Sequence, residues 1–393
     1  WWAEVAATKT CKKPLSMFND MKKIILAMAI AMLAMNANAK KILCKSPAQG
    51  LIERLQTLQK RGVMFGHQDA LFYGTTWKWE FGRSDVNDVC GDYPAVLGCE
   101  LGGLELGNDK NLDGVPFDKM RQQIIAHHQK GGIVTISWHP YNPVTGKDAW
   151  NTEGDAVTAV LPGGKEAGKM QLWHKRMADF MASLKDEKGR AVPVIFRPWH
   201  EMSGAWFWWG NKQCTPEQYK ALFRLTFDAM AQAGLRNLVW SYSPNAQAND
   251  TPEHYFLFYP GDSYVDVLGV DLYQYNGSAV FIEQCQNEMR IMSEYAKSHN
   301  KLYALTEAGY RNTPDAQWYS STLVPAIKGF APSYVLLWRN AWDKAEENFG
   351  PAPDKTCADD FRKIYKEGVF LFRSKLKSEP NKSCWMVSKK RKK

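Results

Sequence analysis

Eight short apolar runs alternate with helix-like segments, and this rhythm restricts the fold more than any other feature of the chain. Each run is rich in Val, Ile, Leu and aromatic residues, as is typical of strands buried on both faces of a parallel sheet. Strands that alternate with helices form either a closed (β/α)8 barrel or an open doubly wound sheet. The runs lie at 62–68, 93–100, 132–140, 192–201, 237–245, 265–273, 302–310 and 334–342.

The segments between the runs carry helix patterns. Residues 117–130 place apolar side chains at helical spacing and stop at Gly131. Residues 215–234 open with Thr215 and Gln218 in a capping box, with a proline at the first helical position. We predict further helices at 279–297 and 314–328, and an extra helix at 48–60 before the first strand.

The carboxyl ends of the runs favour the barrel over the open sheet. Nearly every run ends in polar or aromatic side chains, and only in a closed barrel do all such ends converge on one active face. We therefore predict an α/β protein, a single-domain (β/α)8 TIM barrel with a short N-terminal helix. The side chains at these ends are His67, Gln68, Glu100, Trp138, His139, His200, Glu201, Tyr242, Asp271, Tyr273, Glu307, Trp338 and Arg339.

The two ends of the chain differ from its body. Residues 21–39 combine a lysine pair, an apolar stretch and an Ala-Asn-Ala end, which is the pattern of a secretory signal peptide. The stretch is shorter than the roughly 20 residues that span a bilayer, so we predict export, to the periplasm or the medium, and no membrane span. We divide the chain into a non-native or mis-set leader (1–20), the signal peptide (21–39), the barrel (40–372) and a basic, non-native or disordered tail (373–393).

The net charge of +9 is confined to these ends. Residues 1–39 carry an excess of three positive charges and residues 373–393 an excess of eight, which leaves −2 for the body. A basic field restricted to a tail is not a nucleic-acid-binding face. We expect no nucleic-acid partner, and a neutral polymer fits the body better.

No cofactor or metal is predicted. The chain lacks the CxxC, HExxH, P-loop and dinucleotide-binding patterns. Export permits disulfides, but six cysteines allow 15 sets of pairs and the sequence does not choose among them. These six are Cys44, Cys90, Cys99, Cys214, Cys285 and Cys357.

Two runs, the fourth and the seventh, end in a carboxylate, Glu201 and Glu307. Such a pair suits glycoside hydrolysis, in which one carboxylic acid protonates the leaving oxygen while the other attacks the anomeric carbon or activates water. Tryptophans near Glu201 would hold the flat face of a sugar and raise the pKa of the carboxyl by lowering the local dielectric. The tryptophans in question are Trp199, Trp206, Trp208 and Trp209.

The motifs "GHQDALFYG", "SWHP", "RPWHEMSGAWFWWG", "VDLY", "LTEAGY" and "LLWRNAW" occur in this order between residues 45 and 372. With them the chain resembles the β-mannanases of glycoside hydrolase family 26. Most families of the same clan have Asn before the acid/base, whereas this family has His, which His200 matches. The resemblance implies that Glu201 is the acid/base and Glu307 the nucleophile of a retaining enzyme, whose two carboxyl groups lie about 5–5.5 Å apart.

The resemblance also implies roles for seven further residues. Tyr273 would donate a hydrogen bond to the nucleophile, and Asp271 would position the same neighbourhood. His139 and His200 would contact the sugar at the point of cleavage, above a floor formed by Trp338. Arg339 would bind hydroxyls further along the glycone side, and Trp206 would stack on the leaving-group side.

Each of these residues also has a structural interpretation. Glu201 could pair with Arg197, Glu307 could cap a helix, and the histidines could be core donors or metal ligands. Trp208 and Trp209 could simply pack, and the role of Glu100 is open. The joint placement of the two glutamates at strands four and seven favours catalysis. For the residues after the first strand, subsite lining and packing are equally weighted: Asp69, Trp77 and Trp79.

We therefore predict a secreted, monomeric endo-β-1,4-mannanase whose partner is β-mannan, glucomannan or galactomannan. The alternatives are a β-1,3-xylanase, a mixed-linkage β-glucanase or a mannobiose-releasing exo-enzyme of the same family, and a non-catalytic glycan-binding barrel. The loop 141–169 would wall the mouth of the barrel, where a closed cleft end would favour exo action.

Overall fold

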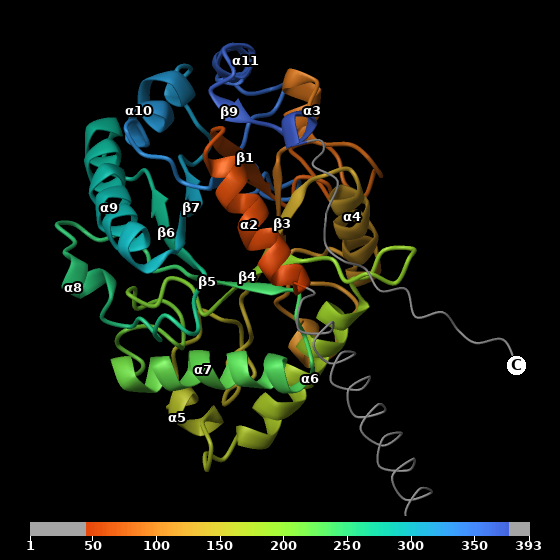
Figure 1. Ribbon diagram of the computed structural model, residues 1–393, viewed down its shortest axis with the longest axis vertical. Helices are drawn as coiled ribbons and strands as arrows, with labels where there is room; N and C mark the ends of the chain where they lie inside the picture. The colour runs from red at the N-terminus through yellow and green to blue at the C-terminus, as the bar shows by residue number, and fades with distance from the viewer. Residues whose placement is uncertain (1–44, 377–393) are drawn as a thin grey trace, which may run out of the picture. The chain divides into compact units, whose positions relative to one another are not determined.

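A closed barrel of eight parallel strands forms the centre of the protein. The computed structural model describes residues 45–376. Neighbouring strands pair in chain order, and pairs of β1 with both β8 and β2 close the ring (Figure 1). The predicted (β/α)8 TIM barrel is confirmed. Its strands are β1 (Val63–Gln68), β2 (Val96–Glu100), β3 (Ile133–Trp138), β4 (Val194–Pro198), β5 (Leu238–Tyr242), β6 (Val267–Tyr273), β7 (Leu302–Gly309) and β8 (Tyr334–Leu337).

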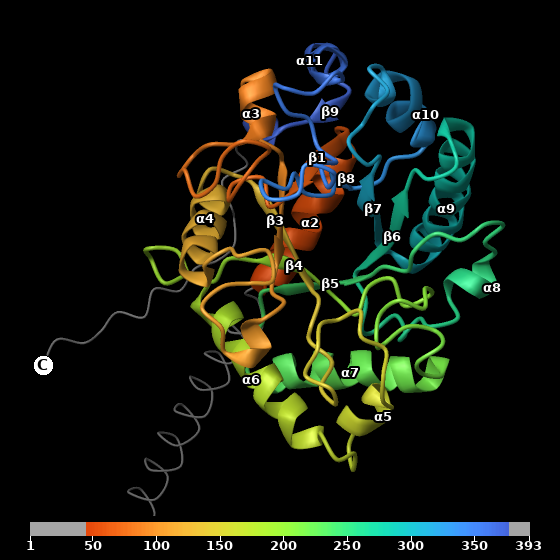
Figure 2. The same cartoon turned by 180° about the vertical axis from the view of Figure 1, so that it is seen from behind.

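Helices surround the barrel on its outer side (Figures 1 and 2). The capping box predicted at the start of α7 is present, because Thr215 Oγ1 accepts from Gln218 N at 3.2 Å and Gln218 Oε1 accepts from Thr215 N at 2.8 Å. The α-helices are α2 (Pro47–Gln59), α3 (Asp85–Cys90), α4 (Phe117–Gln129), α5 (Ala156–Val160), α6 (Ala167–Ser183), α7 (Pro216–Gln232), α8 (Pro252–Tyr255), α9 (Ser278–His299), α10 (Val324–Ala326) and α11 (Ala358–Lys366).

The helix predicted at 314–328 is wrong in its extent. The segment contains a π-helical turn, η2 (Tyr319–Leu323), followed by the single turn of α10. Pro325 stands in the first turn of α10. A proline has no backbone N–H to donate to the preceding turn, so the regular pattern of α-helical hydrogen bonds is interrupted at this position.

Helix α2 covers one end of the barrel (Figure 1) and packs against β1, β5 and β7. Its buried residues Leu51, Leu55 and Leu58 join a cluster of apolar side chains from the amino-terminal ends of the strands. Leu376 belongs to the same cluster and is 3% exposed. The carboxyl ends of the strands, at the opposite end of the barrel, remain available for a site.

The folded chain extends past residue 372, where the barrel was predicted to end. Residues Phe370–Leu371 form β9, which pairs with β1, and Arg373–Leu376 form a 3-10 turn, η3. The Arg373 guanidinium lies 3.8 Å from the centroid of the Tyr93 ring. The first four residues of the predicted tail therefore pack on the barrel, because Arg373 and Leu376 both find partners there.

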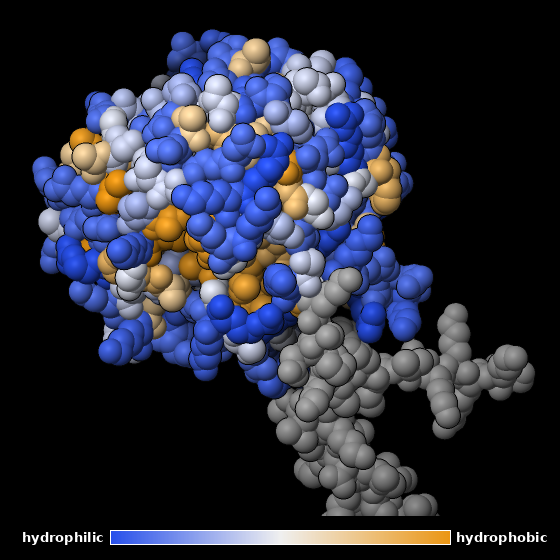
Figure 3. Space-filling view, turned by 90° about the horizontal axis from the view of Figure 1, so that it is seen from above, coloured by the Kyte–Doolittle hydropathy of each residue, from blue (hydrophilic) through white to orange (hydrophobic). Residues whose placement is uncertain are grey.

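The predicted leader, the signal peptide, Cys44 and the tail beyond residue 376 lie outside the described residues. Between residues 45 and 376, no helix has the length and apolar character needed to cross a membrane. The face seen in Figure 3 is mostly hydrophilic, with hydrophobic residues in several separate groups. Five cysteines fall within the described range, and all are free thiols: Cys90, Cys99, Cys214, Cys285 and Cys357.

Candidate active site

The turn that follows β4 has an uncommon backbone. Strand β4 ends at Pro198 rather than at Glu201, and the next residues turn sharply. Trp199 and Glu201 both lie in the left-handed region, with φ of 56° and 55°. Bulky residues rarely adopt this conformation, which persists where surrounding contacts enforce it.

Three hydrogen bonds to the backbone of successive residues enforce the turn. They run from Tyr219 Oη to Trp199 O (2.8 Å), from Trp209 Nε1 to His200 O (2.8 Å) and from Glu201 N to Ser243 O (2.7 Å). Two of the donors are buried aromatic side chains, so the backbone conformation of the turn is fixed by the protein core. The Glu201 side chain is thereby held in the cavity at the mouth of the barrel.

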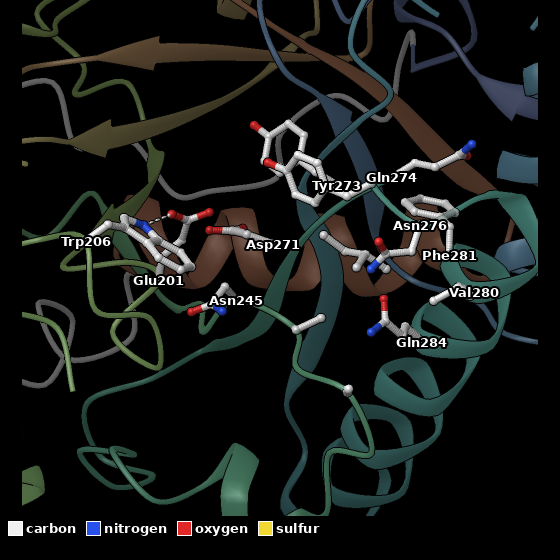
Figure 4. Close-up of a pocket in the computed structure, with 14 residues that line it drawn as sticks. Glu201, Trp206, Asn245, Asp271, Tyr273, Gln274, Asn276, Val280, Phe281 and Gln284 are labelled. Atoms are coloured by element: carbon white, nitrogen blue, oxygen red, sulfur yellow. Dashed lines mark hydrogen bonds between the residues drawn. The ribbon is translucent and has the colours of Figure 1, made fainter. Parts of the chain in front are cut away.

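The surroundings of Glu201 favour the protonated carboxyl that a general acid needs. Burial raises the pKa of its carboxyl well above the ordinary value, and the negative charges of Glu307 and Asp271 raise it further. Trp206 Nε1 donates a hydrogen bond to Glu201 Oε2 at 2.7 Å (Figure 4). The Trp206 ring is 42% exposed, so it also offers a surface to a ligand.

The other tryptophans near this turn do not ring the carboxylate. Trp199, Trp208 and Trp209 are fully buried, and their rings meet edge to face at centroid distances of 5.3–5.5 Å. The expectation that they hold a sugar is wrong, and the packing interpretation of Trp208 and Trp209 is correct. Among these four tryptophans of the described chain, Trp206 is the one whose indole N–H donates to Glu201.

Glu307 lies on β7, is buried, and has both carboxylate oxygens occupied by donors. Tyr273 Oη donates to Oε1 at 2.5 Å, and Arg197 Nη2 donates to Oε2 at 2.5 Å. These hydrogen bonds from a phenol and a guanidinium fix the orientation of the carboxylate, as a nucleophile requires.

Arg197 joins Glu307 to Asp271. Its Nη1 donates to Asp271 Oδ2 at 2.6 Å, while Asp271 Oδ1 accepts from Ser243 Oγ at 2.7 Å and from Thr306 Oγ1 at 2.8 Å. Burial raises the pKa of Asp271 to about 7, with Arg197 lowering it and Glu307 raising it. Burial alone would lower the pKa of Arg197, but the two carboxylates raise it above its ordinary value.

A bulge between β6 and β7 brings these groups together. Val270 pairs with Leu305 and Asp271 pairs with Glu307, which leaves Thr306 as the extra residue on β7. Adjacent strand residues ordinarily face opposite sides, and a bulge re-aims them. Thr306 and Glu307 therefore both reach the Arg197–Asp271 network.

Sequence reasoning missed the role of Arg197. It considered a pair with Glu201, whereas the ion pairs of Arg197 in the described chain are with Asp271 and Glu307. The informative pattern is a charged residue in the middle of an apolar strand, because a buried arginine needs carboxylate partners. The partners lie 74 and 110 residues away, which local patterns do not reveal.

His139 and His200 form a hydrogen-bonded chain that starts at Glu100. The Glu100 carboxylate accepts from His139 Nδ1 at 2.8 Å and from His139 N at 2.7 Å, and His139 Nε2 lies 2.9 Å from His200 Nε2. Burial would lower the pKa of His139, but Glu100 raises it overall. Burial, Arg197 and His139 together lower the pKa of His200 well below its ordinary value.

The charged form of His139, which Glu100 favours, can donate both to Glu100 and to His200 Nε2. In that state a neutral His200 carries its own proton on Nδ1. His200 Nδ1 is buried and has no hydrogen-bond partner among residues 45–376. Glu100, whose role was open, therefore positions His139.

Trp338 and Arg339 follow β8. Trp338 N donates to Ala308 O at 2.9 Å, next to Glu307, and its half-buried ring lies 6.1 Å from the His139 ring. Arg339 is largely buried and pairs with Asp113 at 2.8 Å and Glu347 at 2.7 Å. These two carboxylates, not singled out in the sequence, hold the guanidinium in one orientation.

The loop 141–169 does reach the mouth. Its Trp150 is 50% exposed and stacks on His139 with centroids 5.4 Å apart and an interplanar angle of 15°. Of the residues after β1, Asp69 accepts from Tyr73 and Trp77 donates to Asp85, and both are buried within the fold. Trp79 is half-buried beside a separate cavity of 230 Å³.

Nothing in the described range gathers three or more His, Cys, Asp or Glu side chains in a way that could hold a metal ion. The two glutamates and their partners can perform acid/base and nucleophilic chemistry.

Comparison with known proteins places the chain in one family of glycoside hydrolases. Residues 41–367 match the profile of Glycosyl hydrolase family 26. A mannan endo-1,4-beta-mannosidase of Bifidobacterium adolescentis is 32% identical over 329 residues, 78% of this chain but only 32% of that protein. One of Bacillus subtilis is 30% identical over 274 residues, 66% of this chain and 70% of that protein. The solved GH26 beta-mannanase of Bacteroides ovatus has 42% identity and a TM-score of 0.83 over 86% of this chain and 98% of its own.

Proposed function

The chain belongs to glycosyl hydrolase family 26, and we propose that it is an exported endo-β-1,4-mannanase acting on β-mannan, glucomannan or galactomannan with retention. One observation carries the proposal. The carboxyl group of Glu201 has a strongly raised pKa, whereas Glu307 accepts hydrogen bonds from Arg197 and Tyr273 on both oxygens. A proton donor thus stands beside an oriented carboxylate.

The first step forms a glycosyl ester. The Glu307 carboxylate attacks the anomeric carbon while the Glu201 carboxyl gives its proton to the glycosidic oxygen, whose bond to that carbon breaks. Glu201 becomes a carboxylate, which the Trp206 N–H stabilises through its hydrogen bond to Oε2. The leaving portion departs with the proton.

The second step returns the enzyme to its starting state. The Glu201 carboxylate takes a proton from a water molecule, whose oxygen attacks the anomeric carbon from the side that the leaving group vacated. The ester bond to Glu307 breaks, and its charge returns to the carboxylate held by Arg197 and Tyr273. Two inversions at one carbon give net retention.

The choice of sugar rests on the relatives and on charge. Two curated relatives at 30% identity or more, from Bifidobacterium adolescentis and Bacillus subtilis, are named mannan endo-1,4-beta-mannosidases, and the body of the chain carries a net charge of only −2, as suits a neutral polymer. Aromatic rings at the mouth, Trp150, Trp206 and Trp338, offer flat apolar surfaces of the kind on which sugar rings stack.

Product analysis on mannan, glucomannan, laminarin and xylan tests the sugar and the mode of attack together. We expect mannan and glucomannan to give a ladder of oligosaccharides, with the β-anomer appearing first by proton NMR. Mannobiose as the sole early product would contradict endo action, and an initial α-anomer would contradict retention. Hydrolysis of laminarin or xylan in place of mannan would contradict the proposed substrate.

Export rests on the pattern at residues 21–39. We expect expression in a bacterial host to deliver the protein to the periplasm or medium with residue 40 as its first residue, determined by N-terminal sequencing. Cytoplasmic protein with the segment intact would contradict export.

A further inference from the structure

The loop between β6 and α9 contains the only Asn-Gly pair of the chain, Asn276–Gly277. The side-chain amide of an asparagine can react with the backbone nitrogen of the next residue, which makes asparagine a labile residue. A glycine in the next position has no Cβ and leaves its nitrogen open to close approach. The surroundings of Asn276 therefore decide whether the pair is protected or reactive.

Both residues of the pair are exposed, and nothing in the described chain holds their reacting groups. The Asn276 amide and the Gly277 N–H have no hydrogen-bond partner among residues 45–376. A Cβ placed on Gly277 would meet no atom of a non-neighbouring residue within 4 Å, so the space around the reacting nitrogen is open. The fold therefore leaves the amide and the nitrogen free to meet.

The pair forms the tip of a loop that is held on both sides. On one side, Gln274 N donates to Gly309 O at 2.9 Å, and Gln274 Oε1 accepts from Trp318 Nε1 at 2.7 Å. On the other side, α9 begins at Ser278. The exposed tip can change its backbone conformation, as ring closure requires, while its flanks stay in place.

The start of α9 favours a negatively charged product. Gly277 is the N-cap of this 22-residue helix, it makes no side-chain cap, and no acidic residue stands in the first turn. The N–H groups of the first turn lack partners within the helix and give this end a partial positive charge. A carboxylate at position 276 would lie beside that charge, so the modified chain should keep the helix.

We propose that Asn276 is a site of spontaneous deamidation, at which the protein acquires one extra negative charge with time. The deprotonated Gly277 nitrogen attacks Asn276 Cγ and forms a new C–N bond. The Cγ–Nδ2 bond breaks, and ammonia leaves with a proton from the solvent, which gives a succinimide ring. Water then adds to one ring carbonyl and breaks its bond to nitrogen. Opening at Cγ gives aspartate, and opening at the backbone carbonyl gives isoaspartate, each as a carboxylate and one released proton.

The new charge changes the cavity at the mouth of the barrel. Asn276 and Glu201 line the same cavity of 300 Å³, and no Lys or Arg is among its described lining residues (Figure 4). The carboxylate therefore adds to the negative potential of the cavity without a counter-charge there. Deamidation does not rest on the proposed function, because ring closure needs only the pair itself and water.

The single Asp-Gly pair of the chain, Asp113–Gly114, provides a contrast. An aspartate can close to the same ring with loss of water, but only when its carboxyl is free to reach the next nitrogen. The Asp113 side chain is 5% exposed and pairs with Arg339 Nη1 at 2.8 Å. The fold therefore protects this pair, and we expect it to react only in the unfolded chain.

Ageing the folded protein at mildly alkaline pH, in water labelled with ¹⁸O, tests the proposal. We expect the peptide that contains Asn276 to exchange an NH group for one labelled oxygen and to become a substrate for an isoaspartate-specific methyltransferase. A more acidic species should appear on ion exchange, at a rate that rises with pH because ring closure needs the deprotonated nitrogen. Asn276→Gln should lose this species, because the longer side chain does not form the succinimide.

Asn249 is the matched control within the chain, because it is exposed and precedes Asp250 instead of a glycine. Its peptide should stay unmodified over the same period, and Asp113 should form isoaspartate only in urea. An unmodified Asn276 peptide, equal modification at Asn249, or an undiminished acidic species in Asn276→Gln would each overturn the proposal. Circular dichroism of the aged protein should match that of the fresh protein, and a loss of helical signal would contradict the argument from the start of α9.

Discussion

Glu201 and Glu307 are the same residue type at the ends of two strands, yet their neighbours differ. Glu201 receives one hydrogen bond, from an indole, and lies near two other carboxylates. Glu307 receives hydrogen bonds from a guanidinium and a phenol. The surroundings, not the residue type, divide the roles of acid and nucleophile.

Replacing either glutamate by alanine should lower turnover on mannan by at least about 100- to 1,000-fold, because each supplies a chemical step. Glu201→Ala should be partly spared on an aryl glycoside whose leaving group needs no proton, whereas Glu307→Ala should not. Steady-state kinetics on both substrates check this. Equal and small losses in the two variants would contradict the assignment.

Trp206→Phe should shift the pH profile. The indole N–H hydrogen bond lowers the pKa of Glu201 relative to burial alone. Its loss should therefore raise that pKa and move the basic limb of the kcat/KM profile to higher pH, by about half a unit to one unit. Trp342→Phe is the control, because Trp342 stacks with Lys78 and should leave the limb in place. A shift to lower pH would contradict the argument.

At the scale of elements, local patterns predicted the strands but not the partners of their end residues. The apolar runs located all eight strands, and the capping box located the start of α7. Local patterns did not predict side-chain partners or burial where these depend on elements far apart in the sequence. The partners of Arg197 come from β6 and β7, and the burial of Trp208 and Trp209 follows from the fold of the turn after β4. Both depend on contacts between strands that no local window contains.

Helix α9 holds a carboxyl group whose titration affects stability. Glu288 is 1% exposed, and neither of its carboxyl oxygens has a hydrogen-bond partner among residues 45–376. Burial raises its pKa to about 9, and the nearby Asp250, in the segment after β5, raises it further, while Arg290 lowers it. The buried groups Cys285, Tyr242 and Tyr255 also face it.

Glu288→Gln should stabilise the protein increasingly as pH rises. The folded-state pKa of about 9 exceeds the unfolded value of about 4.3, so between these limits only the folded state binds the proton. The free energy of unfolding of the wild type therefore falls as pH rises through this window, by up to about 1.4 kcal/mol per unit. The amide removes this term. The difference in Tm between variant and wild type should grow from pH 5 to pH 8.5, and a constant difference would contradict the argument.

At the scale of the whole molecule, the two ends of the barrel have different functions. The end at the amino termini of the strands stabilises the fold, because α2 and Leu376 complete the apolar cluster there. The mouth carries the carboxylates and the exposed rings. The end of the folded chain was harder to predict than the barrel. Arg373 and Leu376 pack on the barrel, but they belong to a lysine-rich segment whose composition is typical of a solvated tail.

Two truncations test this boundary. Ending the chain after Phe372 removes Arg373 from Tyr93 and Leu376 from the lower cluster, which should cost about 2 kcal/mol and lower Tm by about 5 °C. Ending it after Leu376 is the control and should leave Tm unchanged. Both should abolish any binding to polyanions while hydrolysis of mannan survives. Equal Tm values for the two truncations would show that the 3-10 turn contributes nothing.

Helix α2 also determines how a long polymer can approach. The apolar face of α2 packs against the amino-terminal ends of the strands and closes that end of the barrel, and side chains fill the barrel interior. A polysaccharide therefore cannot pass through the barrel and must lie across its open end. Both cleavage products then leave into the solvent on the side from which the polysaccharide bound.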